Sequence, residues 1–211
     1  MDYELKALSC LLLYPDARLK DGLDEIRGVI ESGNRIPPVP KEELLSFADY
    51  LKSSYLSELQ KQYVATFDVG KRASLNLFEH MHGDSRERGA AMLRLKKLYE
   101  DRGLEVKSIE MPDFLPMFLE FLSGLSSKEA SIYLNSAAKH IAALDVELKK
   151  EESPWKAVTG AILSLTDYKP EEVKADRDDL IPQTEAESFE SPVRFGGSAD
   201  PVQTIHFQSK K

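Results

Sequence analysis

The feature that most constrains this chain is the spacing of its apolar residues, which recur every three or four positions over the first four fifths of the sequence. One series contains Leu19, Leu23, Ile26 and Ile30, and a longer one contains Leu134, Ala138, Ile141, Leu144 and Leu148. On a helix this spacing forms one apolar face, whereas a half-buried strand needs alternation, which is rare here. We therefore predict an all-α fold, a single-domain bundle of about seven to nine helices.

Composition divides the 211 residues into a helical body and a tail. The body, 1–168, is long enough for one domain with a substantial core. The tail, 169–211, contains four of the eleven prolines and nine acidic residues against six basic ones. Because it has no helical stripe longer than a turn or two, we expect it to be irregular. Contacts of Phe189, Val193 and Phe195 with the body would fix it locally.

Several helix boundaries can be predicted from capping residues. The helix starts that we expect are at Asp84 (with Glu87 three residues later), at Asp113 and at Ser153, and the ends are near Gly103, Gly124 and Asp167. Asp and Ser accept hydrogen bonds from unpaired N–H groups at a helix start, and Glu87 would complete a variant capping box. Gly103 is placed to end its helix in the left-handed conformation, and Pro154 suits a first turn.

The charge balance excludes some partners. With a formal net charge of -8 the chain lacks the broad basic surface that binds nucleic acid or anionic lipid, so we expect no nucleic-acid partner. No apolar run approaches the roughly 20 residues of a membrane span, and Met1–Lys6 does not resemble an export signal. We therefore expect a cytoplasmic protein without membrane insertion. The single cysteine, Cys10, is expected to be a small buried thiol.

Two stretches, 63–92 and 110–122, combine bulky apolar residues with many His, Arg, Asp and Glu residues. Neither contains a recognisable nucleophile. Gly70-Lys71 lacks the glycine and the hydroxyl residue that a phosphate loop requires. The string Glu79 to His82 is not H-E-x-x-H, and on a helix His80 and His82 would point to different faces. We therefore predict binding rather than catalysis, with no bound cofactor.

Two alternatives stay open for this region. One is a metal-dependent hydrolase that uses Glu79, His80 and His82, and the other is a helical scaffold that only brings two proteins together. The nearby arginines also allow two interpretations. In the first, they form a solvated helix face with ion pairs inside the helix. In the second, Arg86 or Arg88 organises a buried acid such as Glu79, whose carboxylate a guanidinium can hold with two hydrogen bonds.

The motifs of these stretches resemble the nitrate reductase delta subunits, the molybdenum cofactor assembly chaperones of the NarJ and NarW type. The resemblance rests on Tyr63-x-x-x-Phe67-Asp68-x-Gly70, on Ser74-Leu75-x-Leu77-Phe78-Glu79-His80-x-His82-Gly83-x-Ser85-Arg86-x-Arg88-Gly89, and on Pro112-Asp113-x-Leu115-Pro116-x-x-Leu119-Glu120-x-Leu122. It extends from Leu12 to the tail segment 190–196. Val69 stands where the resemblance leads us to expect an arginine.

The resemblance implies a function within the wider class of redox-enzyme maturation proteins, which are all-helical chaperones and not enzymes. A member would bind the N-terminal segment of the nitrate reductase catalytic (alpha) subunit, either alone or in the alpha-beta apo-complex. It would hold the apoenzyme competent for molybdenum cofactor insertion and delay membrane docking until maturation. Contact with the proteins that deliver the cofactor is also implied as possible for such a chaperone.

The residues and the resemblance together suggest a groove that takes one face of an amphipathic helix. The expected apolar floor consists of Tyr63, Phe67, Leu77, Phe78, Leu115, Phe118 and Leu119. The expected polar rim consists of Asp68, Glu79, His80, His82, Glu110, Asp113 and Glu120. The matched motifs add Ser85, Arg86, Arg88 and Pro116 to the candidate site. In this hypothesis the floor provides affinity and the rim fixes the register of the partner.

Overall fold

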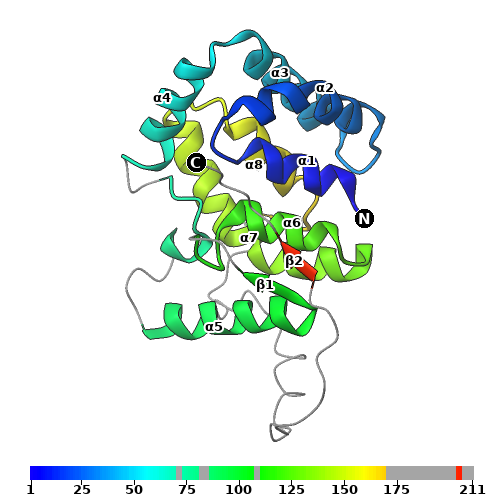
Figure 1. Cartoon of the computed structure of the whole chain (residues 1–211), viewed down its shortest axis with the longest axis vertical. Helices are drawn as coiled ribbons and strands as arrows, with labels where there is room; N and C mark the ends of the chain where they lie inside the picture. The colour runs from blue at the N-terminus through cyan, green and yellow to red at the C-terminus, as the bar shows by residue number, and fades with distance from the viewer. Residues whose placement is uncertain (70–72, 81–85, 107–109, 170–202, 206–211) are drawn as a thin grey trace, which may run out of the picture.

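The computed structural model describes residues 1–69, 73–80, 86–106, 110–169 and 203–205 (Figure 1). Within these ranges the elements are α1 (Tyr3–Leu11), α2 (Ala17–Ser32), α3 (Pro38–Ser53), α4 (Leu56–Phe67), the 3-10 helix η1 (Leu77–His80), α5 (Arg86–Asp101), β1 (Leu104–Val106), α6 (Leu115–Ser123), α7 (Ser127–Lys150), α8 (Lys156–Leu163) and β2 (Gln203–Ile205). The predicted all-α bundle is therefore confirmed. The two short strands were not predicted from the sequence.

The apolar series form the faces that their spacing predicts. On α2, Leu23 and Ile30 are buried, and Leu19 and Ile26 pack partly buried against the core. On α7 the buried set includes Leu134, Ala138, Ile141, Leu144 and Leu148. The long helix α7 also begins with a complete capping box between Ser126 and Glu129, which helps to fix its start.

The core lies between the N-terminal helices and the α6–α7 pair. Helix α1 packs against α2, α6 and α8, and its Leu5, Leu8 and Leu11 are buried. Helix α3 packs against α2 and α8, and α7 packs against α6, α8 and η1. In Figure 1, α1 to α4 and α8 form the upper part of the molecule, α6 and α7 cross its middle, and α5 lies below with the two strands. Among the described residues, no helix is both long and apolar enough to cross a membrane.

Two of the predicted boundaries around α5 and α6 are confirmed and one is wrong. Gly103 follows α5 with φ of 73°, the left-handed conformation that glycine adopts without strain. Gly124 closes α6. Asp113, however, does not cap α6, because Phe114 occupies the N-cap position without a side-chain hydrogen bond. The Asp113 carboxylate is instead directed to Phe78 of η1. The predicted start at Asp84 lies outside the described residues.

The last helix is shorter than predicted at both ends. Ser153 and Pro154 belong to a turn that precedes α8, and Trp155 holds the N-cap position without a side-chain cap. Helix α8 ends at Leu163 rather than near Asp167. Asp167 is held by Asn135 of α7, which exchanges hydrogen bonds of 2.8 and 2.9 Å with its backbone N–H and its carboxylate. This tertiary contact draws the chain away from the helix.

Most of the tail, 169–211, lies outside the described residues. Phe189, Val193 and Phe195, expected to fix the tail, lie outside the described residues. The described residues of the tail are Lys169 and the three residues of β2, which pairs in parallel with β1. These three residues are thus extended strand rather than irregular chain.

Candidate functional site

The structure brings the two chemically dense stretches of the sequence into direct contact. Asn76 and Phe114 form an antiparallel bridge between them. The Leu115 N–H donates to the Leu75 carbonyl at 2.8 Å, and the Leu77 N–H donates to the Asp113 carbonyl at 3.0 Å. These backbone hydrogen bonds place η1 beside the start of α6.

Asp113 lies at the centre of this junction. Its side chain is fully buried, and its Oδ2 accepts a hydrogen bond of 3.0 Å from the Phe78 N–H. Burial raises the pKa of the Asp113 carboxyl, because removal from water disfavours the charged form. The Phe78 N–H and the positive charge of Arg88 oppose this shift, and the negative charge of Glu79 adds to it. The three charged residues therefore form one electrostatic cluster.

Arg88 connects α5 to this cluster. Its Nη2 lies 3.1 Å from Glu79 Oε1. Arg88 therefore pairs with Glu79, but Glu79 is exposed and is not the buried acid that the second interpretation expected. Further along α5, Lys96 and Glu100 form an ion pair of 3.7 Å with i, i+4 spacing, which is typical of a solvated helix face. Helix α5 therefore has an ion pair within the helix and an ion pair to η1.

The last two turns of α4 contribute Tyr63 and Phe67 to an aromatic cluster. The ring of Tyr63 contacts the rings of Phe67 and Trp155, with centroid distances of 4.7 and 5.7 Å. Trp155 also contacts Phe47 and Phe67 edge to face. The Tyr63 hydroxyl donates to the Leu12 carbonyl at 3.0 Å. Our sequence analysis missed Trp155, although it is the single tryptophan of the chain.

The expected apolar floor of the groove is buried in this structure. Tyr63, Phe67, Leu77, Phe78, Leu115, Phe118 and Leu119 are at most 8% exposed. An accessible floor made of these side chains is therefore wrong for this conformation, because the rings pack against one another, against Trp155 and against α7. Phe78, for example, meets His140 of α7 edge to face at 5.9 Å. Their spacing indicated an apolar face, and that face is satisfied inside the domain.

Some apolar side chains outside this buried set are accessible to solvent. Desolvation raises the pKa of Tyr63, and the negative charges of Asp68 and Glu110 add to the shift, so both acids lie near this tyrosine. Their neighbours Val69 and Met111 are exposed, at 76% and 44%. The half-exposed Tyr14 contacts Tyr63 edge to face at 5.4 Å.

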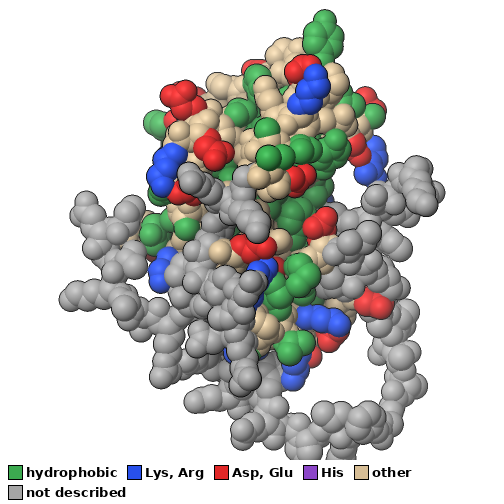
Figure 2. Space-filling model, turned by 90° about the vertical axis from the view of Figure 1, so that its left-hand side faces the viewer, with side chains coloured by type: hydrophobic (Ala, Val, Ile, Leu, Met, Phe, Trp, Pro, Cys, Tyr) green, Lys and Arg blue, Asp and Glu red, His purple; other side chains and the backbone are tan. Residues whose placement is uncertain are grey.

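We call Tyr14, Asp68, Val69, Glu110 and Met111 the Tyr63 patch. It contains two acids of the predicted rim and three apolar residues that the sequence analysis did not select. Figure 2 views the molecule from the side where α4 and η1 lie in Figure 1. Hydrophobic side chains gather in the middle of this face, with acidic side chains beside them. By its composition the patch combines apolar and acidic groups, as the groove hypothesis requires.

Of the other predicted site residues, two make contacts between helices, and the rest are residues whose side chains or positions are not described. Glu120 pairs with Lys6 of α1, and the Pro116 carbonyl accepts a hydrogen bond of 2.7 Å from the Ser9 hydroxyl. Both contacts join α6 to α1. His80 ends η1 and Arg86 begins α5, but their side chains are not described; His82 and Ser85 lie outside the described residues.

The described residues do not form a metal site. No group of three or more His, Cys, Asp or Glu side chains among them is arranged to hold a metal ion. The alternative that uses Glu79, His80 and His82 cannot be compared with this arrangement, because it depends on two imidazoles that are not described. It is therefore left to experiment.

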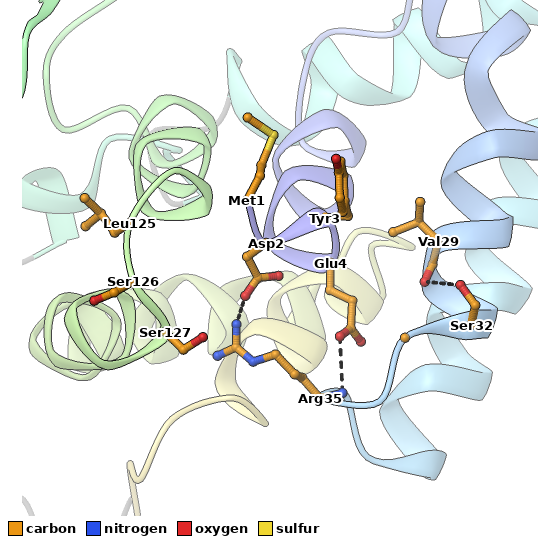
Figure 3. A pocket seen from close by; sticks show the side chains of 11 residues that line it. Met1, Asp2, Tyr3, Glu4, Val29, Ser32, Arg35, Leu125, Ser126 and Ser127 are labelled. Atoms are coloured by element: carbon orange, nitrogen blue, oxygen red, sulfur yellow. Dashed lines mark hydrogen bonds and ion pairs between the residues drawn. The ribbon is translucent and has the colours of Figure 1, made fainter.

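A separate cavity of about 540 Å³ lies at the start of α1. Figure 3 shows Asp2 and Arg35 facing each other across it, with Glu4 beside them. Asp2 pairs with Arg35 and also caps α1 by accepting from the Leu5 N–H. Glu4 accepts from the N–H groups of Arg35 and Ile36, at 3.2 and 3.3 Å. Because these charged groups satisfy one another, the cavity is best explained as a junction between α1 and the α2–α3 loop.

The sequence matches a known family over most of the helical body. Residues 37–158 match the family described as nitrate reductase delta subunit. The match includes the aromatic cluster of α4, the Arg88–Glu79 pair and all of α6 and α7.

Individual relatives cover nearly the whole chain. It is 36% identical to the nitrate reductase molybdenum cofactor assembly chaperone NarJ of Escherichia coli (strain K12), over 96% of this chain and 90% of that protein. It is 35% identical to the probable chaperone NarW of the same strain, over 90% of this chain and 83% of the relative. It is 33% identical to the probable chaperone NarJ of Bacillus subtilis (strain 168), over 75% of this chain and 85% of that protein.

Proposed function

The chain belongs to the nitrate reductase delta subunit family, and from this membership we propose that it is a chaperone of nitrate reductase maturation rather than an enzyme. In this proposal it binds the N-terminal segment of the catalytic (alpha) subunit, alone or in the alpha-beta apo-complex. It holds the apoenzyme competent for molybdenum cofactor insertion and delays membrane docking until then. The names of the relatives, which are assembly chaperones, support this role.

The observation that carries the proposal is the Tyr63 patch. A partner segment with apolar residues on one side and basic residues beside them would meet Tyr14, Val69 and Met111 through its apolar side. Its basic groups would meet Asp68 and Glu110. The buried rings beneath would then support the patch instead of touching the partner, and Glu79 would be a further acid at the rim.

A transient complex needs only modest affinity. Burying about 300 Å² of apolar surface gives a gross gain of about 7 kcal/mol at 25 cal/mol per Å². Ordering the partner and losing translational freedom reduce this gain. Binding at 1 µM corresponds to roughly 8 kcal/mol, so apolar contact at this patch is not sufficient by itself, and ion pairs and contacts outside the patch would supply the difference. A complex of this strength dissociates fast enough to release a finished enzyme.

Calorimetry with a synthetic peptide of the alpha subunit's N-terminal segment tests the binding step. We expect saturable binding with a negative heat-capacity change, because apolar surface is buried. A peptide of the same composition in scrambled order is the matched control. If neither heat nor competition is detected at about 100 µM peptide, the proposed binding step is wrong.

Reductase maturation in cells tests the chaperone role itself. Nitrate reductase produced with and without this chain is purified, and its molybdenum content per alpha subunit is measured beside its subunit composition. A chaperone that serves cofactor insertion raises the molybdenum content of fully assembled enzyme. If the content changes only in step with assembly, the chain is a helical scaffold, the alternative left open by the sequence.

A further inference from the structure

The C-terminal end of the chain returns to pair with a strand from its middle. Residues Gln203–Ile205 form β2, which lies parallel to β1, Leu104–Val106. The register places Leu104 opposite Gln203, Glu105 opposite Thr204 and Val106 opposite Ile205. In Figure 1 the red arrow of β2 lies beside the green arrow of β1, above α5. Within the described residues these two strands make up the whole sheet.

Strand β1 is held in place by contacts that do not involve β2. The left-handed turn at Gly103 reverses the chain after α5, and β1 packs against that helix. Leu104 is partly buried against the hydrophobic core. The backbone of β1 is therefore extended and positioned before any partner strand arrives, which makes it an acceptor edge.

The pairing of β2 with this edge is suited to reversible opening. Three residues in parallel pairing contribute few hydrogen bonds, and each has a modest net effect because water competes for the same groups. Closing the long connection between α8 and β2 has an entropic cost that opposes them. A pairing of only three residues is therefore open to competition by another extended segment.

We propose that β1 is a docking edge for an extended polypeptide segment, and that Gln203–Ile205 is its built-in occupant. The chain's own C-terminal end keeps the edge closed, and a competing extended segment binds only when β2 leaves. Recognition is through backbone hydrogen bonds, so the fitting partner is an extended strand rather than a helix. The edge is distinct from the Tyr63 patch, although Glu110 of that patch follows β1 by four residues.

Disulfide trapping in the full chain tests the intramolecular pairing. In a Cys10→Ser background, which removes the single native cysteine, Glu105→Cys is combined with Thr204→Cys. Neighbouring strands lie about 4.8 Å apart, within the Cα separation that a disulfide spans. The control combines Glu105→Cys with Ser209→Cys. We expect the first pair to crosslink within one chain about fivefold faster than the control, because paired residues have a higher effective concentration. Equal rates, or crosslinks mainly between two chains, would overturn the proposal.

A peptide supplied separately tests whether β2 closes the edge. A labelled peptide of residues 200–211 is titrated into the oxidised crosslinked chain, the same chain after reduction, and a Thr204→Pro chain. Proline removes an N–H and disfavours strand pairing, so this variant should leave the edge open. We expect the Thr204→Pro chain to bind the peptide about tenfold more tightly than the oxidised chain does. The affinity of the reduced chain should lie between these two values.

Amide signals of Leu104–Val106 show where the added peptide binds. Ser209→Pro is the matched control and should behave as the wild type, and the melting temperature of each chain checks its folding. If all chains bind the peptide equally, or if the Thr204→Pro chain does not bind it, β1 is not a docking edge that β2 closes.

Discussion

Arg88 Nη2 lies 3.1 Å from Glu79 Oε1, and this ion pair joins the first turn of α5 to η1. It also places a positive charge near the buried carboxyl of Asp113, whose pKa it lowers against the effect of burial. One arginine thus connects a surface acid and a buried acid from two stretches of sequence. Its position is the basis of the first prediction.

A double-mutant cycle with Arg88→Met and Glu79→Gln measures the strength of this ion pair. We expect a coupling free energy of about 0.5–1 kcal/mol, because both side chains are partly accessible to water. The measurement is urea denaturation of the wild type, both single variants and the double variant. A coupling energy of zero would show that the contact contributes nothing to stability.

Replacement of Asp113 by Asn should change the pH dependence of stability. Burial raises the pKa of Asp113 in the folded chain above its usual value of 3.8, so the folded state binds the proton more readily than the unfolded state. This contribution is complete below 3.8 and is lost as pH rises through the raised pKa. Relative to the wild type, the Asp113→Asn variant should therefore gain stability as pH increases from 3.8 upward. Urea denaturation across this range measures the difference, and a constant difference would contradict the argument.

Asp113→Ala is the matched control for this substitution. Asn retains an oxygen that can accept from the Phe78 N–H, whereas Ala leaves that buried donor without its acceptor. We expect Asp113→Ala to lower the free energy of unfolding by about 1–3 kcal/mol. Equal stability of the Asn and Ala variants at neutral pH would show that the hydrogen bond is unimportant.

Gly33→Ala should destabilise the chain through a clash with Glu4. An added Cβ would lie 2.3 Å from Glu4 Cδ, and Glu4 is held by the N–H groups of Arg35 and Ile36. We expect a loss of about 1–3 kcal/mol in the free energy of unfolding. Gly28→Ala is the control, since its Cβ meets nothing within 4 Å, and it should stabilise α2 by up to about 1 kcal/mol. Thermal melting compares the two, and equal effects would refute the predicted contact.

Substitution of exposed residues in the Tyr63 patch should weaken binding of the alpha-subunit peptide without unfolding the chain. We expect Val69→Ser and Met111→Ser each to reduce affinity about tenfold, because each removes apolar contact area. Leu93→Ser on α5, at a residue that is also strongly exposed, is the control and should leave affinity unchanged. If Leu93→Ser weakens binding as much as the patch variants, the peptide binds elsewhere.

The metal-dependent alternative predicts a different result from the chaperone proposal. Under the chaperone proposal, purified protein contains no stoichiometric metal, and a chelator leaves its melting temperature unchanged. Elemental analysis and melting with and without chelator measure both. About one zinc per chain, lost together with stability in the His80→Ala or His82→Ala variant, would favour the hydrolase.

The sequence predicted the bundle and its apolar faces, but it did not predict which apolar residues would be accessible. The spacing of Tyr63 and Phe67 shows that both lie on one face of α4. It does not show that Trp155, from the turn before α8, packs against them. The same spacing is produced by a buried face and by a groove, because both need one continuous apolar stripe. Val69 and Met111 became candidates only when their exposure was known.

The capping residues also show which helix boundaries the sequence can predict and which it cannot. Gly103 ends α5 as expected, because a left-handed residue after a helix is a local property of the backbone. Asp113 does not cap α6, because the N–H of Phe78 competes for its carboxylate from a distant part of the chain. Local sequence cannot rank a nearby donor against a distant one.

The sequence by itself determined the helical class, the apolar faces of α2 and α7, and the family. These follow from periodicity, local backbone preference and a long series of matched residues. Only the tertiary structure decided which faces are covered, that Asp113 is buried, that two acids lie beside Tyr63, and that Gln203–Ile205 pairs with β1. The reason is physical: burial, pKa shifts and strand pairing depend on neighbours that are distant in sequence and become adjacent only in the folded chain.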